Sequence, residues 1–197
     1  MDGPTGQPEP EGTDVAEFTI CAYKDQAAHG AATGILPDDG TLTGHHMIPD
    51  HCFFYTSGLR GKGYLGAFWC PGVMFYDIND APVILLSADN NGGKSRNHGL
   101  AHAVFDPIET TASQTGNEWT YAEARAAAVR SIATQFPPSE ATVRDALDNY
   151  FIATLGMTDD TVIRAGEHGT MASAPEPRRS GRAPRAKLVP SQRFSPY

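Results

Sequence analysis

A continuous apolar run, Ala81-Pro82-Val83-Ile84-Leu85-Leu86, gives this chain its clearest structural constraint. A run of this length is typical of a buried strand, and no apolar segment approaches the roughly 20 residues that a membrane span needs. Hydrophobic residues make up 40% of the 197 residues, a share that supports a real core. We therefore expect one small globular domain of the α+β class, with residues 83–87 as a buried strand.

Two further extended segments precede this strand. Residues 15–23 have the composition of an edge strand, and residues 41–49 form an extended segment that ends at Pro49. Between residues 51 and 80, aromatic side chains are interleaved with glycines, which disrupts both helical and strand periodicity. We expect this segment to be irregular and packed on the core.

The second half of the chain carries helix signals. Residues 95–105 predict a short helix that ends before Pro107. Thr120 and Glu123 form a capping box at the start of a second helix, and Ser139 caps a third. Two consecutive prolines separate the last two helices, so the sequence predicts an αα-hairpin packed against the mixed core.

Charge is distributed unevenly along the chain. The formal net charge is −8, but six of the 15 basic residues lie within residues 178–193, a segment without acids. Residues 1–177 therefore hold nine basic and 23 acidic side chains, a net charge of −14. We expect a flexible segment at 1–14, a folded domain at 15–157 and a basic tail rich in Pro and Arg at 158–197. Such a tail is typical of segments that contact nucleic acid or another acidic partner.

The chain shows neither a signal peptide nor a disulfide framework. Residues 1–10 lack the basic and apolar regions of a secretory signal, so we expect any export to use another route. The three cysteines, Cys21, Cys52 and Cys70, include no CxxC pair. We expect Cys52 and Cys70 to be small buried side chains. A Cys/His nucleophile remains an alternative, because His51 directly precedes Cys52.

Four of the seven histidines fall into two tight pairs, which carry the chemistry. His98 and His102 are four residues apart on the expected helix, so both rings lie on one face, one turn apart. Two imidazoles in this arrangement can chelate one divalent metal. A third nitrogen ligand would leave one coordination position open for water or substrate, as in catalytic sites.

The other pair, His45 and His46, stands on an extended segment. Adjacent side chains there point in opposite directions, so only one of the two can join a metal site in simple strand geometry. The other can then act on substrate as a general base, because a neutral imidazole near pH 7 accepts a proton from water. A metal and a base together suit phosphoryl hydrolysis.

The order of these residues resembles a known family. Gly44-His45-His46-Met47-Ile48-Pro49, followed by a strand and by a helix bearing His-x3-His, is similar to the pattern of the HNH and endonuclease VII superfamily, the ββα-metal or His-Me finger nucleases. In particular, the chain looks like the GHH nuclease domains of bacterial polymorphic toxins and type VI secretion effectors. The likeness covers about residues 41–108. It implies a ββα-metal core, here with an added αα-hairpin and flexible termini.

The resemblance assigns the metal ligands and the base residue by residue. It implies that His45, His98 and His102 bind one divalent metal, which is Mg²⁺, Mn²⁺ or Zn²⁺. It implies that His46 is the general base that deprotonates the attacking water.

Four further residues complete the expected site. Asn79 matches the middle residue that orients the base in this family, with Asp80 as an equally placed alternative. Lys94 and Arg96 come just before the ligand helix, so we expect them to lie near the metal and to contact substrate phosphates.

The resemblance also implies a biological setting. It implies a DNase toxin delivered into the cytoplasm of a competing bacterium by a secretion apparatus or carrier domain, without membrane insertion. A cognate immunity protein would neutralise it in the producer. RNA remains open as a substrate. Two alternatives remain as well: a metal- or Cys/His-dependent hydrolase of a non-nucleic substrate, and a non-enzymatic binding module whose histidines hold a structural metal.

Overall fold

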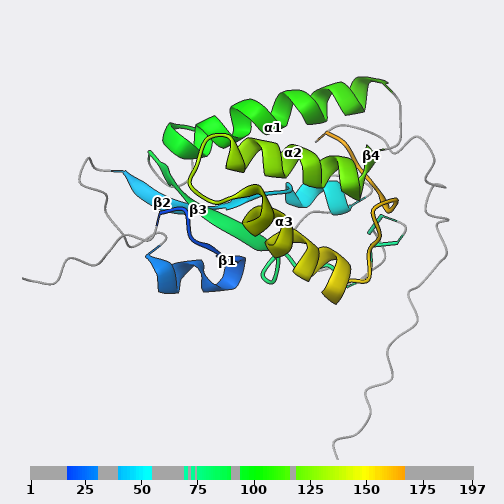
Figure 1. Ribbon diagram of the computed structural model, residues 1–197, viewed down its shortest axis with the longest axis horizontal. Helices are drawn as coiled ribbons and strands as arrows, with labels where there is room; N and C mark the ends of the chain where they lie inside the picture. The colour runs from blue at the N-terminus through cyan, green and yellow to red at the C-terminus, as the bar shows by residue number, and fades with distance from the viewer. Residues whose placement is uncertain are drawn as a thin grey trace, which may run out of the picture.

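The fold combines short antiparallel strands with helices (Figure 1). The computed structural model describes residues 17–30, 40–54, 69–70, 72–73, 75–89, 94–115 and 119–166. The expected flexible segment 1–14 and the basic residues 178–193 lie outside these ranges. The α+β class expected from the sequence is confirmed for the described residues.

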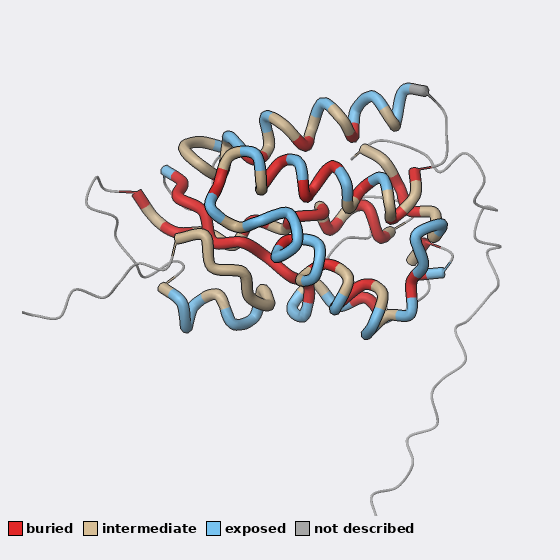
Figure 2. Tube along the Cα trace, viewed as in Figure 1, coloured by how far each residue is buried: buried red, intermediate tan, exposed pale blue. Residues whose placement is uncertain are grey.

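A three-stranded sheet forms the centre of the molecule. Strand β3 (Pro82–Ala88) pairs antiparallel with β1 (Ile20–Ala22) on one side and with β2 (Thr41–His46) on the other. All seven residues of β3 are buried, and the strand runs through the middle of the trace in Figure 2. The continuous apolar run therefore marks the central strand, as expected for a strand covered on both faces.

The expected edge strand at 15–23 is shorter in the structure. Residues 20–22 pair in register with β3, and Phe18 and Thr19 also exchange backbone hydrogen bonds with Leu85. The 3-10 helix η1 (Tyr23–His29) follows at once, because the amides of Tyr23 and Lys24 donate to the carbonyls of Ala81 and Asn79. This helix packs against β2 and β3 and lies below the sheet in Figure 1.

The described residues of the aromatic segment pack on the core, as expected, whereas residues 55–68, 71 and 74 lie outside the described ranges. A short 3-10 helix, η2 (Asp50–Phe53), packs the ring of Phe53 against those of Tyr76 and Phe151, with centroid distances of 4.5 and 4.7 Å. Cys52 and Cys70 are free and buried, which confirms the expectation of small core side chains.

Helix α1 (Arg96–Thr115) is longer than predicted, because Pro107 does not end it. A proline inside a helix costs about 3 kcal/mol, so other contacts must offset that cost. The turn beyond Pro107 supplies them: Ile108 and Ala112 pack against the core, and Glu109 is buried. Tertiary packing therefore outweighs the local signal. Among the described residues, no helix combines the length and apolar character needed to cross a membrane.

The predicted αα-hairpin is confirmed. Thr120 and Glu123 form the capping box of α2 (Tyr121–Ala133), and the side chain of Ser139 caps α3 (Glu140–Asp148). Helices α2 and α3 pack against each other, and α2 also packs on α1 (Figure 1). A π-helical segment, η4 (Asn149–Thr154), continues α3 and buries Tyr150 and Phe151.

The folded body extends past residue 157, where the expected tail begins. Strand β5 (Val162–Ile163) pairs with β4 (Trp119–Thr120), and the next residue, Arg164, is only 1% exposed. The guanidinium of Arg164 donates to the backbone carbonyls of Phe54, Gly166 and His51 at 2.8, 2.7 and 2.6 Å. Residues 158–166 therefore belong to the packed domain, and the expected boundary is corrected to at least 166.

Candidate metal centre

Three of the predicted histidines meet where β2 faces α1. The ring centroids of His45 and His98 lie 5.0 Å apart, those of His45 and His102 4.8 Å, and those of His98 and His102 4.9 Å. One nitrogen of each ring lies within 4.8 Å of the others. The predicted ligand trio is thus assembled from a strand and a helix that are 53 residues apart in sequence, counted from His45 to His98.

Two glycines permit the close approaches around this trio. A Cβ on Gly44 would lie 2.6 Å from Oε1 of Gln26, the atom that accepts the Gly44 amide at 3.0 Å. A Cβ on Gly99, between the two helical ligands, would lie 2.8 Å from the carbonyl oxygen of Lys94. Gly99 is required because the atom that a Cβ would meet is backbone, whereas at Gly44 the end of the flexible Gln26 side chain could move aside.

The electrostatics of His45 suit a metal ligand. The residue is 3% exposed, and its Nε2 is buried without a hydrogen-bond partner in the described part of the chain. Burial, together with the nearby His102 and His98, holds the pKa of His45 well below its usual value. The neutral imidazole is the form that binds metal, and a buried unpartnered nitrogen is otherwise costly. The trio therefore fits a divalent metal.

His46 lies on the other side of the sheet from the trio. Its ring stacks on Tyr23 of η1, with centroids 4.8 Å apart and an interplanar angle of 24°. The predicted opposite orientation of His45 and His46 is therefore observed. His46 is placed as a separate group beside η1, and the three-imidazole cluster does not include it.

The two candidates for the orienting residue lie in the turn that supports η1. Asn79 donates its backbone amide and its side-chain Nδ2 to Oδ1 of Asp77, each at 2.9 Å, and its carbonyl accepts from Lys24. Asp80 forms an exposed ion pair with Lys24 at 2.7 Å. Both residues thus hold η1, which in turn carries the ring stacked on His46.

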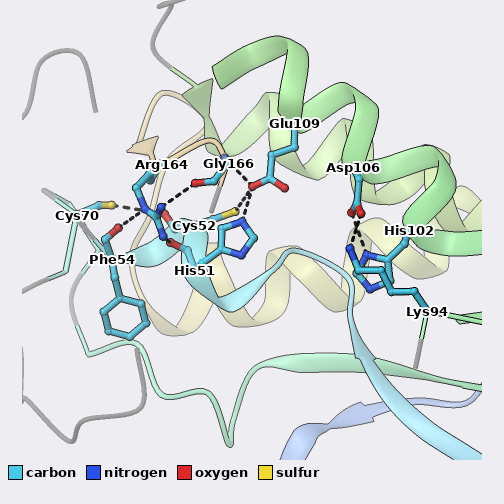
Figure 3. Close-up of polar contacts among 10 residues, drawn as sticks. All are labelled: His51, Cys52, Phe54, Cys70, Lys94, His102, Asp106, Glu109, Arg164 and Gly166. Carbon is cyan, nitrogen blue, oxygen red and sulfur yellow. Dashed lines mark hydrogen bonds and ion pairs between the residues drawn. The ribbon is translucent and has the colours of Figure 1, made fainter. Parts of the chain in front are cut away.

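The two cations ahead of α1 are engaged in ion pairs. Lys94 donates to Oδ2 of Asp106 at 2.6 Å, and Arg96 pairs with Asp89. Lys94 lies beside His102 through this shared carboxylate (Figure 3). Its side chain is 63% exposed, so it can still be reached by a ligand.

Asp106 is a residue of the site that the sequence reasoning missed. Its Oδ1 lies 2.9 Å from Nδ1 of His102. Burial alone would raise the pKa of Asp106, but the hydrogen bonds from Lys94 and His102 hold this pKa below its usual value. The signal that could have found it is the spacing of His98, His102 and Asp106, which places all three on one face of a helix.

A second polar cluster lies further along α1. His51 Nε2 is 2.5 Å from Oε1 of Glu109, and that oxygen also accepts from the Cys52 thiol at 3.4 Å and from the Gly166 amide at 2.8 Å (Figure 3). Three donors converge on one carboxylate oxygen, so the cluster is internally satisfied, unlike the trio around His45. We interpret it as a structural network that ties η2, α1 and residues 164–166 together.

This network bears on the alternative of a cysteine nucleophile. Cys52 is completely buried, and burial together with Glu109 raises the pKa of its thiol well above the usual value. A reactive cysteine needs the opposite conditions, an accessible sulfur and a depressed pKa. The geometry therefore favours the histidine trio as the functional centre.

Comparison of the chain with protein-family models, with curated proteins and with solved structures yields no match. Function is accordingly argued from the site itself.

Proposed function

We propose that the protein is a metal-dependent endonuclease that hydrolyses phosphodiester bonds in DNA. The observation that carries the proposal is the meeting of His45, His98 and His102, each offering one nitrogen within 4.8 Å of the others. Three neutral nitrogen ligands with a fourth position open for water or substrate are typical of catalytic metal sites.

The arrangement of the surrounding elements supports the same proposal. Antiparallel strands β2 and β3 are followed by α1, with one ligand on the first strand and two on the helix. This order agrees with the ββα-metal architecture expected from the Gly-His-His resemblance. We infer that β2, β3 and α1 form such a core and that the αα-hairpin is an addition to it.

The proposed mechanism divides the work between the two faces of β2. His45, His98 and His102 would hold a divalent metal, which when bound would supply Lewis-acid stabilisation of the charge on the scissile phosphate and leaving oxygen. His46 accepts a proton from the attacking water as general base. Tyr23 holds the ring of His46 in place, and Asn79 and Asp80 hold η1. Both ring nitrogens of His46 are buried, so the proposal requires the phosphodiester to reach His46 and the metal at the edge of β2, an outer strand of the sheet.

The charge distribution limits which parts of such a protein can bind DNA. An acidic body repels phosphates, so affinity must come from local cations. Lys94 lies beside the ligand helix with an exposed ammonium group, and Arg96 begins that helix. We propose that these two residues, the metal and the basic segment 178–193 provide the positive surface.

We further propose that the protein acts as an interbacterial toxin that a cognate immunity protein neutralises. This setting is supported by the Gly-His-His pattern of residues 44–46 together with the assembled trio. Co-expression with a neighbouring open reading frame tests this setting, because the proposal predicts that the immunity protein suppresses the toxicity. Toxicity that is independent of His46 and of the trio would contradict it.

A structural role for the metal is the second candidate, and one observation favours it. His45 and His98 are buried, so the trio lies mostly closed to solvent. A closed metal site contributes folding energy outright, in which case chelation unfolds the chain. Chelator-induced unfolding without nuclease activity at any metal would favour this alternative.

The experiment that tests the proposed function is incubation of supercoiled plasmid with the full chain. Mg²⁺, Mn²⁺ and Zn²⁺ are supplied in turn, and the native protein is compared with His46→Ala. The proposal predicts metal-dependent nicking that is lost in the variant. Cleavage that is equal in both proteins, or that survives chelation, would contradict it. A parallel incubation with single-stranded RNA decides between the two nucleic acids.

A further inference from the structure

The clearest unassigned feature near the trio is a chain of polar contacts that leads outward from His102. Nδ1 of His102 lies 2.9 Å from Oδ1 of Asp106, one helical turn further along α1. The other oxygen of that carboxylate accepts from Nζ of Lys94 at 2.6 Å. Figure 3 shows the three side chains converging beside α1, apart from the Glu109 network.

These contacts determine which nitrogen of His102 is free to bind a metal. An ionised carboxylate has no proton to donate, so Nδ1 of His102 must be the donor in this hydrogen bond. A neutral imidazole carries only one proton, and Nε2 is then left with its lone pair. Without the carboxylate, the proton can move to Nε2, where it blocks that lone pair.

We propose that Asp106 is a positioning residue of the metal centre, which fixes His102 in the tautomer whose Nε2 binds the metal, and that Lys94 holds Asp106 in that role. The inference rests on the proposed metal centre and adds a residue that orients one of its ligands without binding the metal. Carboxylates that accept from a ligating imidazole orient the ring and increase its basicity, and their loss typically lowers metal affinity about 10–100-fold.

The local backbone explains how Lys94 reaches this carboxylate. The amide of Asp89 donates to Oγ of Ser95 at 2.8 Å, and the amide of Gly99 donates to the Ser95 carbonyl at 2.8 Å. The missing side chain at Gly99 lets the carbonyl of Lys94 lie against the first turn of α1. The turn is therefore held against the helix, with the Lys94 ammonium group directed to Asp106.

The first test reads the tautomer directly in the metal-free full chain. Nitrogen-15 spectra of the histidine rings, recorded at about pH 8 so that imidazoles are neutral, distinguish a protonated Nδ1 from a protonated Nε2. We expect His102 to carry its proton on Nδ1 in the native chain and to shift toward the Nε2-protonated form in Asp106→Ala. A native His102 that is protonated on Nε2 would overturn the proposal, whether or not any variant folds.

The second test measures affinity for Co²⁺ by titration, without nucleic acid. Asp106→Ala is expected to weaken binding about 10–100-fold. Asp106→Asn is expected to weaken it less, because the amide oxygen still accepts from Nδ1. Asp145→Ala, which removes an exposed carboxylate from α3, serves as the matched control and should bind as the native chain does.

The outcomes separate this inference from the function on which it rests. If the native chain binds Co²⁺ and Asp106→Ala binds equally well, the role of Asp106 is refuted while the metal centre stands. If the native chain binds no metal, the proposed function itself fails. If Asp106→Ala does not fold, Asp106→Asn and the native tautomer still decide the question.

Discussion

His45 and His46 are neighbours in sequence, but their rings lie on opposite faces of β2. The ring of His45 lies within 5.0 Å of both histidines of α1, measured between centroids. The ring of His46 stacks on Tyr23 of η1 instead. The alternation of side chains along a strand imposes this separation. The proposed metal binding and the proposed proton transfer would therefore be carried by different residues, and substitutions should separate the two.

Replacement of His46 by Ala should abolish catalysis without loss of the metal. A general base contributes about 10²–10⁴-fold to a rate, so DNA cleavage should fall by that factor. Because His46 is not part of the imidazole trio, the affinity for Co²⁺ should stay close to that of the native chain. Single-turnover cleavage and metal titration measure the two quantities. A parallel loss of metal affinity would show that His46 belongs to the metal centre.

The aromatic ring of Tyr23 should affect the rate of DNA cleavage because it stacks on His46. Tyr23→Phe keeps the stack and should cleave DNA at close to the native rate. Tyr23→Ala removes a contact worth about 0.5–1.5 kcal/mol, so the rate should fall roughly 2- to 10-fold with unchanged metal affinity. Cleavage assays on the two variants give the comparison. Faster cleavage by Tyr23→Ala would instead mean that η1 obstructs His46.

The Glu109 network should make stability depend on pH on the acid side. Burial would raise the pKa of Glu109. The hydrogen bonds from His51, Gly166 and Cys52 outweigh that effect and leave the pKa below its usual value. A carboxylate whose pKa is lower in the folded state stabilises the fold above its unfolded-state pKa, about 4, and loses this contribution as pH falls through the folded value.

The corresponding variant is Glu109→Gln. It should lower the free energy of unfolding at pH 7 by about 1–3 kcal/mol, because the donors lose a charged acceptor. It should also flatten the dependence of stability on pH below about 4. Urea denaturation at several pH values measures both effects, with Asp145→Asn, at an exposed position of α3, as the control. An unchanged pH slope in Glu109→Gln would contradict the assignment.

The two candidate ends of the domain should behave differently on truncation. A chain that stops at residue 166 keeps β5 and the buried guanidinium of Arg164 and should fold. A chain that stops at 157 loses both and leaves the carbonyls of His51 and Phe54 without their donor. Circular dichroism and thermal melts compare the two. A stable fold for the shorter chain would restore the boundary first expected from composition.

Much of this fold was predictable because its signals are local. The capping box at Thr120 and the cap at Ser139 satisfy amides within their own first turn. The apolar run at 83–87 marked the central strand. The spacing of His98 and His102 and the alternation at His45 and His46 follow from the periods of helix and strand. These features do not depend on distant residues.

The features that were missed depend on long-range contacts. Helix α1 continues past Pro107 because Glu109 meets His51 and Gly166, which are 58 and 57 residues away in sequence. Arg164 lies in a segment whose composition suggested a tail, but backbone carbonyls more than 100 residues earlier accept its protons. Asp106 could have been identified from its helical spacing, whereas its partner Lys94 is brought to it by the fold of the preceding turn.

Metal titration of the full chain tests the central claim most directly. The metal-free protein is titrated with Co²⁺ by calorimetry, alongside His102→Ala and His46→Ala. The trio predicts one Co²⁺ site per chain. His102→Ala should lower its affinity by more than the roughly 10–100-fold that is typical when a residue that only orients a ligand is lost. His46→Ala should leave the affinity unchanged. Binding that is unchanged in His102→Ala, or absent from the native chain, would contradict a metal centre formed by these histidines.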